Sequence, residues 1–391
     1  AVRFVYLMTG VAHLARLSHD ESKRQDCLRL WNNMAQRQLY ITGGIGSQSS
    51  GEAFSSDYDL PNDTVYAESC ASIGLMMFAR RMLEMEGDSQ YADVMERALY
   101  NTVLGGMALD GKHFFYVNPL EVHPKSLKFN HIYDHVKPIR QRWFGCACCP
   151  PNIARVLTSI GHYLYTPRED ALYINIYAGN SKEVPVENGT LRLRVSGNYP
   201  WQEQVTIAVE SPQPVRHTLA LRLPDWCIQP QIILNGEEVE QDIRKGYLHI
   251  TREWQEGDTL NLTLPMPVRR VYGNPLVRHV AGKVAIQRGP LVYCLEQADN
   301  GESLHNLWLP ADAPFTTFEG NGLFRHKILI QAPGYRYEQS NPEQQPLWHY
   351  DSAPAKRQPQ ILTFIPWFSW ANRGEGEMRI WVNEETSAIR R

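Results

Sequence analysis

The stretch Tyr165-Thr166-Pro167 marks the point at which the hydrophobic pattern of this 391-residue chain changes. Before it, apolar residues recur at helical spacing over long segments. After it, short runs of alternating apolar and polar residues are separated by Gly, Pro and Asn. We therefore expect a multidomain α+β protein, with a helical domain over residues 1–167 and two antiparallel β-sandwich domains over 168–269 and 270–391.

The helical part is expected to form an incomplete barrel. Its helices are too few to close a helical toroid, and Pro150 and Pro151 suit the first turn of the last one. Between the helices, the Gly- and Ser-rich residues 41–52 are expected to form a loop lining a cleft, and residues 112–145 to be extended and irregular. Helices are expected over residues 1–18, 21–39, 64–86, 88–104 and 150–164.

The β part shows the alternation typical of half-buried strands. In the first β domain, strands are expected over residues 171–177, 190–196, 204–210, 216–223, 230–234, 247–251 and 258–264. In the second, they are expected over 276–286, 291–296 and 360–366. The residues in between, 298–358, are rich in Pro, Gln, Asn and Gly and are expected to form long loops.

Composition excludes some classes of partner. The formal net charge of −3 gives no electrostatic reason to expect nucleic acid or an anionic membrane surface. No stretch approaches the ~20 apolar residues of a membrane span.

Seven cysteines, an odd number in uneven clusters, argue against a secreted disulfide framework and favour metal binding or catalysis in a reducing compartment, so we expect a cytoplasmic protein. The chain opens inside an amphipathic helix without methionine or signal sequence, so we also expect an upstream segment that holds any targeting signal.

Two adjacent cysteines carry the strongest chemical signal. They lie in the run Phe144-Gly145-Cys146-Ala147-Cys148-Cys149-Pro150-Pro151-Asn152, and Glu68-Ser69-Cys70 lies upstream. Together Glu68, Cys70, Cys148 and Cys149 supply three sulfurs and one oxygen, which suit tetrahedral zinc. Positions 68 and 70 lie about 200° apart on a regular helix, so both reach one ion only where the start of that helix is irregular. The alternative is a set of ordinary buried cysteines with a surface glutamate.

The roles of individual residues remain open at this point. Cys148 is a candidate nucleophile, because a metal keeps a thiol deprotonated even though it blunts its reactivity; the alternative is a purely structural four-ligand site. Glu52, on the Gly- and Ser-rich loop, is a candidate general acid, with Asp57 and Asp59 as alternatives. Tyr116 lies in a run of aromatic residues and is either a ligand contact or part of the core.

Two further functional classes compete with a metal-dependent enzyme. A Cys–His hydrolase of peptide or amide bonds requires an imidazole beside Cys148, for which His113 and His131 are the candidates. A non-catalytic carbohydrate-binding or scaffold protein would use the sandwich domains for binding and the zinc for structure alone. The sequence contains no HExxH motif, no phosphate-binding glycine loop and no strand-to-helix GxGxxG.

Three motifs taken in order, Tyr40–Gly46, Tyr66–Ser72 and Cys146–Asn152, resemble glycoside hydrolase family 127. The resemblance covers the chain from end to end. It implies an (α/α)6 barrel followed by two β-sandwich domains, with a substantial part of the barrel lying before the position that matches Ala1. Characterised members are β-L-arabinofuranosidases, so the resemblance implies that activity.

Motif by motif, the resemblance also implies a set of roles. Cys148 corresponds to the nucleophile, Glu52 to the general acid/base, and Tyr116 to a residue near the substrate. The implied reaction is retaining, with the sulfur attacking the anomeric carbon and a separation of about 5–5.5 Å between the two catalytic groups. The implied Zn2+ ligands are Glu68, Cys70, Cys148 and Cys149.

We therefore expect a zinc-dependent glycoside hydrolase that releases β-L-arabinofuranose from oligosaccharides or glycoconjugates. Its expected partner is an arabinose-containing oligosaccharide, with neither nucleic acid nor membrane involved. The β domains are a candidate contact for a homodimer, although no sequence feature specifies one.

Overall fold

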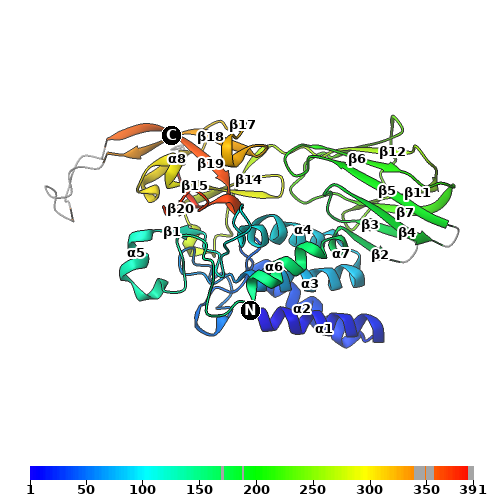
Figure 1. Cartoon of the computed structure of the whole chain (residues 1–391), viewed down its shortest axis with the longest axis horizontal. Helices are drawn as coiled ribbons and strands as arrows, with labels where there is room; N and C mark the ends of the chain where they lie inside the picture. Colours follow the sequence, from blue (N-terminus) through cyan, green and yellow to red (C-terminus); the bar gives the residue numbers. More distant parts are fainter. Residues whose placement is uncertain (169–170, 187–188, 339–347, 349–355, 386–391) are drawn as a thin grey trace.

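The structure is a computed structural model that describes residues 1–168, 171–186, 189–338, 348 and 356–385. Helices from the first part of the chain lie at the lower centre of Figure 1, a β-sandwich lies to their right, and a third group of strands lies above and to the left. The expected multidomain α+β class is confirmed. Within the described ranges, every helix is too short or too polar to cross a membrane.

The helices gather around α3 (Ser69–Glu86), which contacts α1, α4 and α6 and buries most of its residues. Trp31 of α2 is fully buried and packs edge-on against Phe78 of α3 and Tyr91 of α4, which fixes these three helices together. The elements around α3 are α1 (Val2–Ser18), α2 (Glu21–Arg37), α4 (Ser89–Ala98), the π-helical η2 (Leu99–Val103), α5 (Pro124–Phe129), α6 (Cys149–Thr158) and α7 (Gly161–Leu164), with 3-10 turns η1 (Ser50–Glu52) and η3 (His131–Tyr133).

Two helices differ from their expected bounds. The helix expected over 64–86 begins only at Ser69, because the residues before it pair with an extended segment instead. The helix expected over 150–164 is divided into α6 and α7. The hydroxyls of Thr158 and Ser159 donate to main-chain carbonyls one turn back, at 2.9 Å and 2.7 Å, an arrangement that competes with continued helix and precedes Gly161.

The middle of the chain forms a sandwich of two sheets. One sheet has the order β10-β11-β7-β3-β2 and the other β4-β5-β6-β12-β8-β9. All neighbours are antiparallel except β3 and β7, which are parallel. The strands are β2 (Tyr165–Arg168), β3 (Ala171–Ile174), β4 (Asn180–Val186), β5 (Gly189–Gly197), β6 (Gln204–Val209), β7 (Val215–Arg222), β8 (Gln231–Leu234), β9 (Glu237–Glu238), β10 (Ile243–Arg244), β11 (Tyr247–Trp254) and β12 (Thr259–Thr263).

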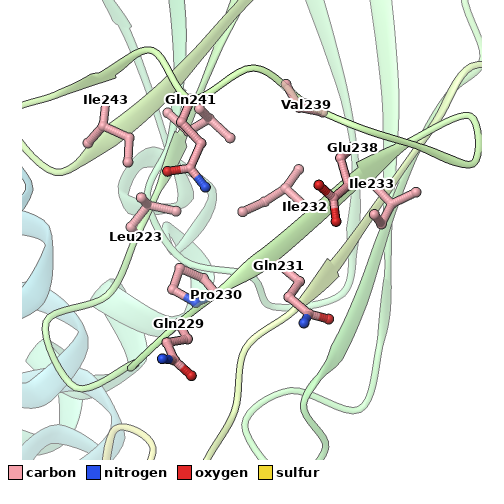
Figure 2. Close-up of a pocket in the computed structure, with 11 residues that line it drawn as sticks. Leu223, Gln229, Pro230, Gln231, Ile232, Ile233, Glu238, Val239, Gln241 and Ile243 are labelled. Carbon is pink, nitrogen blue, oxygen red and sulfur yellow. The ribbon is translucent and has the colours of Figure 1, made fainter.

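A pocket of about 510 Å³ opens on this sandwich beside β8 and β10 (Figure 2). Its polar lining consists of the amides of Gln229, Gln231 and Gln241 together with one carboxylate, that of Glu238. A single ionisable group provides no acid–base pair, so this pocket lacks the groups that glycosidic or acyl hydrolysis would need.

The remaining strands form one ten-stranded sheet that closes on itself. The pairing runs β15-β19-β18-β16-β21-β14, and β14 pairs again with β15. This differs from the two stacked sheets expected of a second sandwich, and the pair β16–β21 is parallel. The strands are β1 (Glu121–Val122), β13 (Val268–Val271), β14 (Lys283–Arg288), β15 (Leu291–Glu296), β16 (Leu307–Pro310), β17 (Thr316–Glu319), β18 (Ile328–Tyr337), β19 (Arg357–Pro366), β20 (Met378–Arg379) and β21 (Val382–Glu385). Short helical turns join them: α8 (Gln297–Asn300), η4 (Arg278–Val280), η5 (Leu304–Asn306), η6 (Gly322–Phe324) and η7 (Trp367–Ser369).

Two expectations for this sheet were wrong. Residues 298–358 were expected to form loops, yet they contain β16, β17 and the ten-residue β18. Gln331, Pro333 and Gly334 weaken the strand signal of β18, and its pairing with β19 decides its conformation. The expected strand 276–286 instead begins with η4, and β14 starts only at Lys283. The ranges 339–347 and 349–355 of the expected loop lie outside the described residues.

Buried charges join the helices to the sandwich. Arg222 at the end of β7 is completely buried and forms salt bridges with Asp93 and Glu96 of α4. Glu96 also accepts hydrogen bonds from the Tyr199 hydroxyl and, at 3.0 Å, from the Trp226 indole. Because each charge has a partner, the interface tolerates their burial.

Arg140 joins the closed sheet to the segment that leads into the cysteine run. Its side chain is buried and donates hydrogen bonds to the carbonyl oxygens of Gly105, Phe368 and Trp370. The guanidinium also lies 4.6 Å from the centre of the Phe115 ring. One side chain thus joins two separate parts of the backbone, Gly105 and Phe368–Trp370, beside the Phe115 ring.

Replacing Arg140 with methionine should therefore lower the free energy of unfolding by roughly 3 kcal/mol, since several buried carbonyls would lose their donor. Urea denaturation of the whole chain measures the change. Arg142→Met is the matched control, because Arg142 is exposed and its one hydrogen bond among the described residues is to His113, at 3.4 Å. The control should shift the free energy by less than about 0.5 kcal/mol. Equal effects of the two substitutions would contradict the role given to Arg140.

Candidate active site and metal centre

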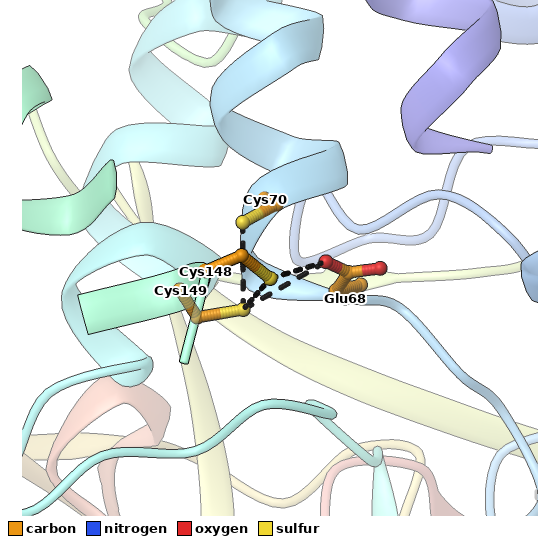
Figure 3. A group of neighbouring side chains, drawn as sticks. All are labelled: Glu68, Cys70, Cys148 and Cys149. Carbon is orange, nitrogen blue, oxygen red and sulfur yellow. Dashed lines mark hydrogen bonds between the residues drawn. The ribbon is translucent and has the colours of Figure 1, made fainter. Parts of the chain in front are cut away.

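Four side chains from two distant segments converge at one point (Figure 3). The ligating atoms of Glu68, Cys70, Cys148 and Cys149 all lie within 4.8 Å of one another. Glu68, Cys70 and Cys149 are buried, and Cys148 is exposed. The structure thus brings together all four residues that the sequence predicted as ligands, and this group could hold a metal ion.

The late start of α3 places Glu68 and Cys70 on the same side. Ala67 has a left-handed φ of 37°, and Glu68 is extended, with φ −60° and ψ 137°. The chain here pairs with an extended segment, because Glu68 bridges to Val117 and the Ser69 N–H donates to the Tyr116 carbonyl at 3.0 Å. The irregular helix start that shared coordination requires is therefore present, and its cause is this pairing.

The cysteine pair is held at the N-terminus of α6. Cys148 is the residue before the helix, Cys149 is the first residue in it, and the prolines that follow lack the N–H groups that would otherwise be unpaired there. The N-termini of α3 and α6 both face the cluster, so the positive ends of two helices lie near its sulfurs. Such a position favours the thiolate form of a cysteine.

The distances within the cluster suit a tetrahedral ion. The sulfur of Cys149 lies 3.5 Å from that of Cys70 and 3.9 Å from that of Cys148. Glu68 Oε1 lies 3.5 Å from the Cys148 sulfur and 3.8 Å from the Cys149 sulfur. Zinc–sulfur and zinc–oxygen bonds of normal length predict edges of about 3.8 Å and about 3.6 Å. The other oxygen of Glu68, Oε2, is buried without a hydrogen-bond partner, as expected for an oxygen near a cation.

Without a cation, the same groups disfavour one another's charges. Burial and the nearby Cys70 raise the pKa of Glu68 to about 7. The hydrogen bond with Cys149 lowers the pKa of Cys70 to about 6 and raises the pKa of Cys149 above its usual range. Burial raises the pKa of Cys148 to about 12. The metal-free cluster therefore keeps protons on two of its sulfurs at neutral pH.

A line of hydroxyls connects the cluster to Glu52. The Cys148 sulfur lies 3.3 Å from the Tyr116 hydroxyl, and the Tyr116 ring packs edge-on against that of Tyr66, with ring centres 6.1 Å apart. The Tyr66 hydroxyl donates to Glu52 Oε1 at 3.1 Å. Burial raises the pKa values of Tyr66 and Tyr116, so both phenols keep their protons. The two predicted catalytic residues thus lie at the ends of one line of contacting side chains.

Glu52 lies at the tip of a tight turn that aims its side chain. Gln48 and Ala53 exchange main-chain hydrogen bonds of 3.0 Å and 3.1 Å around it. Gly51 and Glu52 both have positive φ values, 71° and 51°, a strained conformation for a residue other than glycine. Gly43 anchors the same loop, since a Cβ there would lie 2.5 Å from the Cα of Ala98.

The competing candidates are engaged elsewhere. Asp57 forms a salt bridge with Arg37, and Asp59 forms one with Arg278. His113 pairs with Asp110, and His131 pairs with Asp134. Within the described ranges, the hydrogen-bond partners of Cys148 are Glu68, Tyr116 and Cys149, so the imidazole that a Cys–His hydrolase requires is not among them.

Sequence reasoning missed two residues of the site. Tyr66 contacts both Glu52 and Tyr116. In the sequence, only its position two residues before Glu68 could have indicated that it belongs to the site. Asn152, three residues after Cys149, helps to lower the pKa of Cys70 and donates to the Tyr6 hydroxyl at 2.8 Å. Its spacing from the cysteine pair places Asn152 on the first turn of α6. A buried asparagine at that position is equally typical of ordinary packing, so the sequence did not identify it as part of the site.

Comparison with known families identifies the family of the chain. Family models match three consecutive parts of the chain: the β-L-arabinofuranosidase GH127 catalytic domain matches residues 1–162, the GH127 middle domain 171–266, and the glycoside hydrolase family 127 C-terminal domain 268–383. The chain therefore belongs to glycoside hydrolase family 127, as its motifs suggested.

Individual relatives agree with this assignment. The non-reducing end β-L-arabinofuranosidase of Bifidobacterium longum subsp. longum is 39% identical to this chain, over 97% of the chain and 58% of the relative. The crystal structure of a GH127 β-L-arabinofuranosidase from Geobacillus stearothermophilus T6 superposes with a TM-score of 0.94 at 48% identity, covering 98% of this chain and 60% of that one. A second solved GH127 β-arabinofuranosidase gives a TM-score of 0.88 at 33% identity, with 98% and 60% covered. The chain thus spans about three fifths of the length of these relatives.

Replacing Cys149 with serine should reduce the metal content of the purified protein at least about tenfold, because a buried ligand is lost. Elemental analysis by mass spectrometry measures it, and Glu68→Gln should act in the same direction. Cys146→Ser is the matched control, since Cys146 is exposed and is not among the four clustered residues. Loss of metal from the control as large as that from Cys149→Ser would contradict the ligand set.

Metal affinity should also rise with pH. Above the pKa values of Cys70 and Glu68, about 6 and about 7, and below that of Cys148, about 12, the metal-free protein holds protons on Cys148 and Cys149. A bound ion displaces these protons, so the association constant for Zn2+ should increase about a hundredfold per pH unit in this window. Chelator-competition titrations between about pH 8 and about pH 9 measure the slope. An affinity for Zn2+ that does not change with pH would contradict the presence of these two protons in the metal-free protein.

Proposed function

We propose that this protein is a retaining β-L-arabinofuranosidase that uses Cys148 as nucleophile and Glu52 as general acid/base. Membership of the family and the activities of two relatives support the reaction and the sugar. The observation that carries the residue roles is the path from the Cys148 sulfur through Tyr116 and Tyr66 to Glu52. Cys148 is also the one exposed sulfur among the four clustered residues, so a sugar can reach it.

In this mechanism the Cys148 sulfur attacks the anomeric carbon of the sugar. Glu52 gives its proton to the departing glycosidic oxygen, which leaves a thioether between Cys148 and the arabinose. Glu52, now a carboxylate, takes a proton from water, and the oxygen of that water displaces the sulfur. Two displacements at one carbon retain its configuration. The Tyr116 hydroxyl lies 3.3 Å from the Cys148 sulfur and favours its thiolate form, since contact with it acts to lower the pKa of Cys148. Tyr66 keeps the Glu52 carboxyl aimed at the same space.

The ion that best fits the cluster is Zn2+, since three sulfurs and one carboxylate oxygen are the donors it prefers. Bound there, it would keep the sulfur of Cys148 deprotonated at neutral pH. Glu68, Cys70 and Cys149 would hold the ion whether or not Cys148 is engaged with a sugar, because all three are buried in fixed positions.

We also propose the finer description of the fold. Residues 1–167 would be part of an (α/α)6 barrel, supported by the packing of the other helices around α3. Residues 168–269 and 270–391 would be the two β domains, supported by the separate pairing of their strands. The substrate would be a short arabinose-bearing oligosaccharide or glycoconjugate with its non-reducing end at Cys148. This is supported by the similarity, over nearly the whole of this chain, to a non-reducing end β-L-arabinofuranosidase.

Replacing Cys148 with alanine should abolish hydrolysis of an activated aryl β-L-arabinofuranoside, while Cys146→Ser should leave it within about twofold of the unmodified chain. Replacing Glu52 with glutamine removes the base that activates water, so the protein should accumulate covalently bound arabinose. Intact-protein mass spectrometry detects this addition, and peptide mapping should place it on Cys148.

Two results would overturn this proposal. Full activity of Cys148→Ala would exclude the nucleophile. Activity of the unmodified chain that survives complete removal of metal by a chelator would exclude a role for the cluster in catalysis. A chain that binds zinc and arabinose-containing oligosaccharides but neither hydrolyses the activated substrate nor becomes labelled would instead be the non-catalytic carbohydrate-binding protein.

A further inference from the structure

A second group of potential metal ligands lies apart from the cysteine cluster. It consists of His123, His305 and Glu377, whose ligating atoms all lie within 4.8 Å of one another. His123 precedes α5, His305 lies in η5, and Glu377 directly precedes β20. The group therefore combines one residue from the helical part of the chain with two from the closed sheet.

Glu377 is held firmly in place. Its Oε1 accepts from the Ser303 N–H at 3.1 Å, and its Oε2 accepts from the Leu304 N–H at 2.7 Å. Its own N–H donates to the Gln297 side chain, and its carbonyl accepts from the Gln297 N–H. The carboxylate is only 12% exposed. Each carboxylate oxygen has two lone pairs, so an acceptor site remains free on each of them.

His123 is oriented toward this carboxylate. Its Nδ1 lies 3.2 Å from the Ser126 hydroxyl, and its Nε2 lies 3.6 Å from Glu377 Oε1. A hydroxyl at Nδ1 that fixes the ring and leaves Nε2 free is the usual arrangement of a metal-binding histidine. Nitrogen and oxygen ligands of one tetrahedral ion would lie about 3.4 Å apart, close to the observed separation.

His305 completes the group from the other side. Its ring centre lies 6.4 Å from that of His123, and its main-chain carbonyl accepts from the Asn383 side chain at 2.7 Å. Lys125 and Lys128 pair with Glu302 and Glu375, so these neighbours do not compete for Glu377. An ordinary ion pair consists of one imidazole and one carboxylate. Here two imidazoles lie beside a single carboxylate, which is the composition of a metal site.

We propose that His123, His305 and Glu377 bind a divalent transition-metal ion, with water in the fourth position. Two imidazoles and one carboxylate are a donor set that zinc accepts, and the exposure of His305 leaves room for water. This ion is distinct from the one expected among the cysteines, and the inference does not depend on the proposed hydrolase activity.

The position of the site gives the ion a structural consequence. Glu121 and Val122 pair with Arg379 and Met378, so β1 is already the edge strand of the closed sheet immediately beside the group. An ion bound there would cross-link the start of residues 123–145 to that sheet. Because these residues lead into the cysteine run, the ion would stabilise the folded state of the segment that carries it.

Zinc stoichiometry tests the proposal directly. The whole chain is stripped with a chelator, incubated with excess Zn2+, desalted and analysed for zinc by elemental mass spectrometry. The unmodified chain should hold about two ions, His305→Ala about one, and Cys149→Ser about one. The double variant should hold essentially none. His326→Ala is the matched control, since His326 is exposed and pairs with Glu319 outside the group; it should still hold about two.

Stability gives a readout that is independent of stoichiometry. In Cys149→Ser protein, added Zn2+ should raise the melting temperature, and the rise should disappear when His123 is also replaced by alanine. One zinc per unmodified chain, or two in His305→Ala protein of native circular dichroism, would overturn the proposal. So would a zinc-dependent rise in melting temperature that persists without His123.

Discussion

The gathering of three sulfurs and one carboxylate at a single point, with the carboxylate and two of the sulfurs buried, is the constraint on which the arrangement of this molecule depends. Such groups repel one another once ionised, and only a cation or protons make their proximity tolerable. The fold supplies part of the compensation, since the N-termini of α3 and α6 both face the cluster. The pairing of Glu68 with Val117 delays the start of α3 and so turns Glu68 and Cys70 to the same side.

The same pairing also sets the position of Glu52, the proposed acid/base. Tyr116 lies on the extended segment that pairs with the start of α3, and Tyr66 lies on the segment that precedes α3. The two phenols therefore face each other because their backbones are neighbours, with ring centres 6.1 Å apart. Glu52 is reached through Tyr66, so one local pairing orients both ends of the proposed catalytic path.

The sequence predicted those parts of the fold whose signal is local. Helical spacing located α1 and α2, and alternation located most strands of the sandwich. The closed ring of strands could not be predicted, because its pairings join β14 to β21 and β16 to β18 across long separations. The four clustered residues were predicted as ligands from their types, although the same types also allowed ordinary buried cysteines. Tyr66 and Asn152 were not predicted, since tyrosine and asparagine are common in ordinary packing. The irregular start of α3 was inferred as a condition for shared coordination, but its cause lies in a segment distant in sequence.

The closed sheet contacts the segments that carry the site and helps to hold them in place. Arg140 joins Gly105, near the end of the helical core, to Phe368 and Trp370 beyond β19. Asn101 donates to the Pro290 carbonyl at 3.0 Å and accepts from the Val292 N–H at 2.9 Å, which ties η2 to β15. With β1 paired to β20, residues 112–145 are held at several points by strands from the end of the chain. The placement of Tyr116 and of the cysteine pair therefore depends on contacts formed only once the last strands have been added, so the cluster is a property of the whole chain and not of its helices alone.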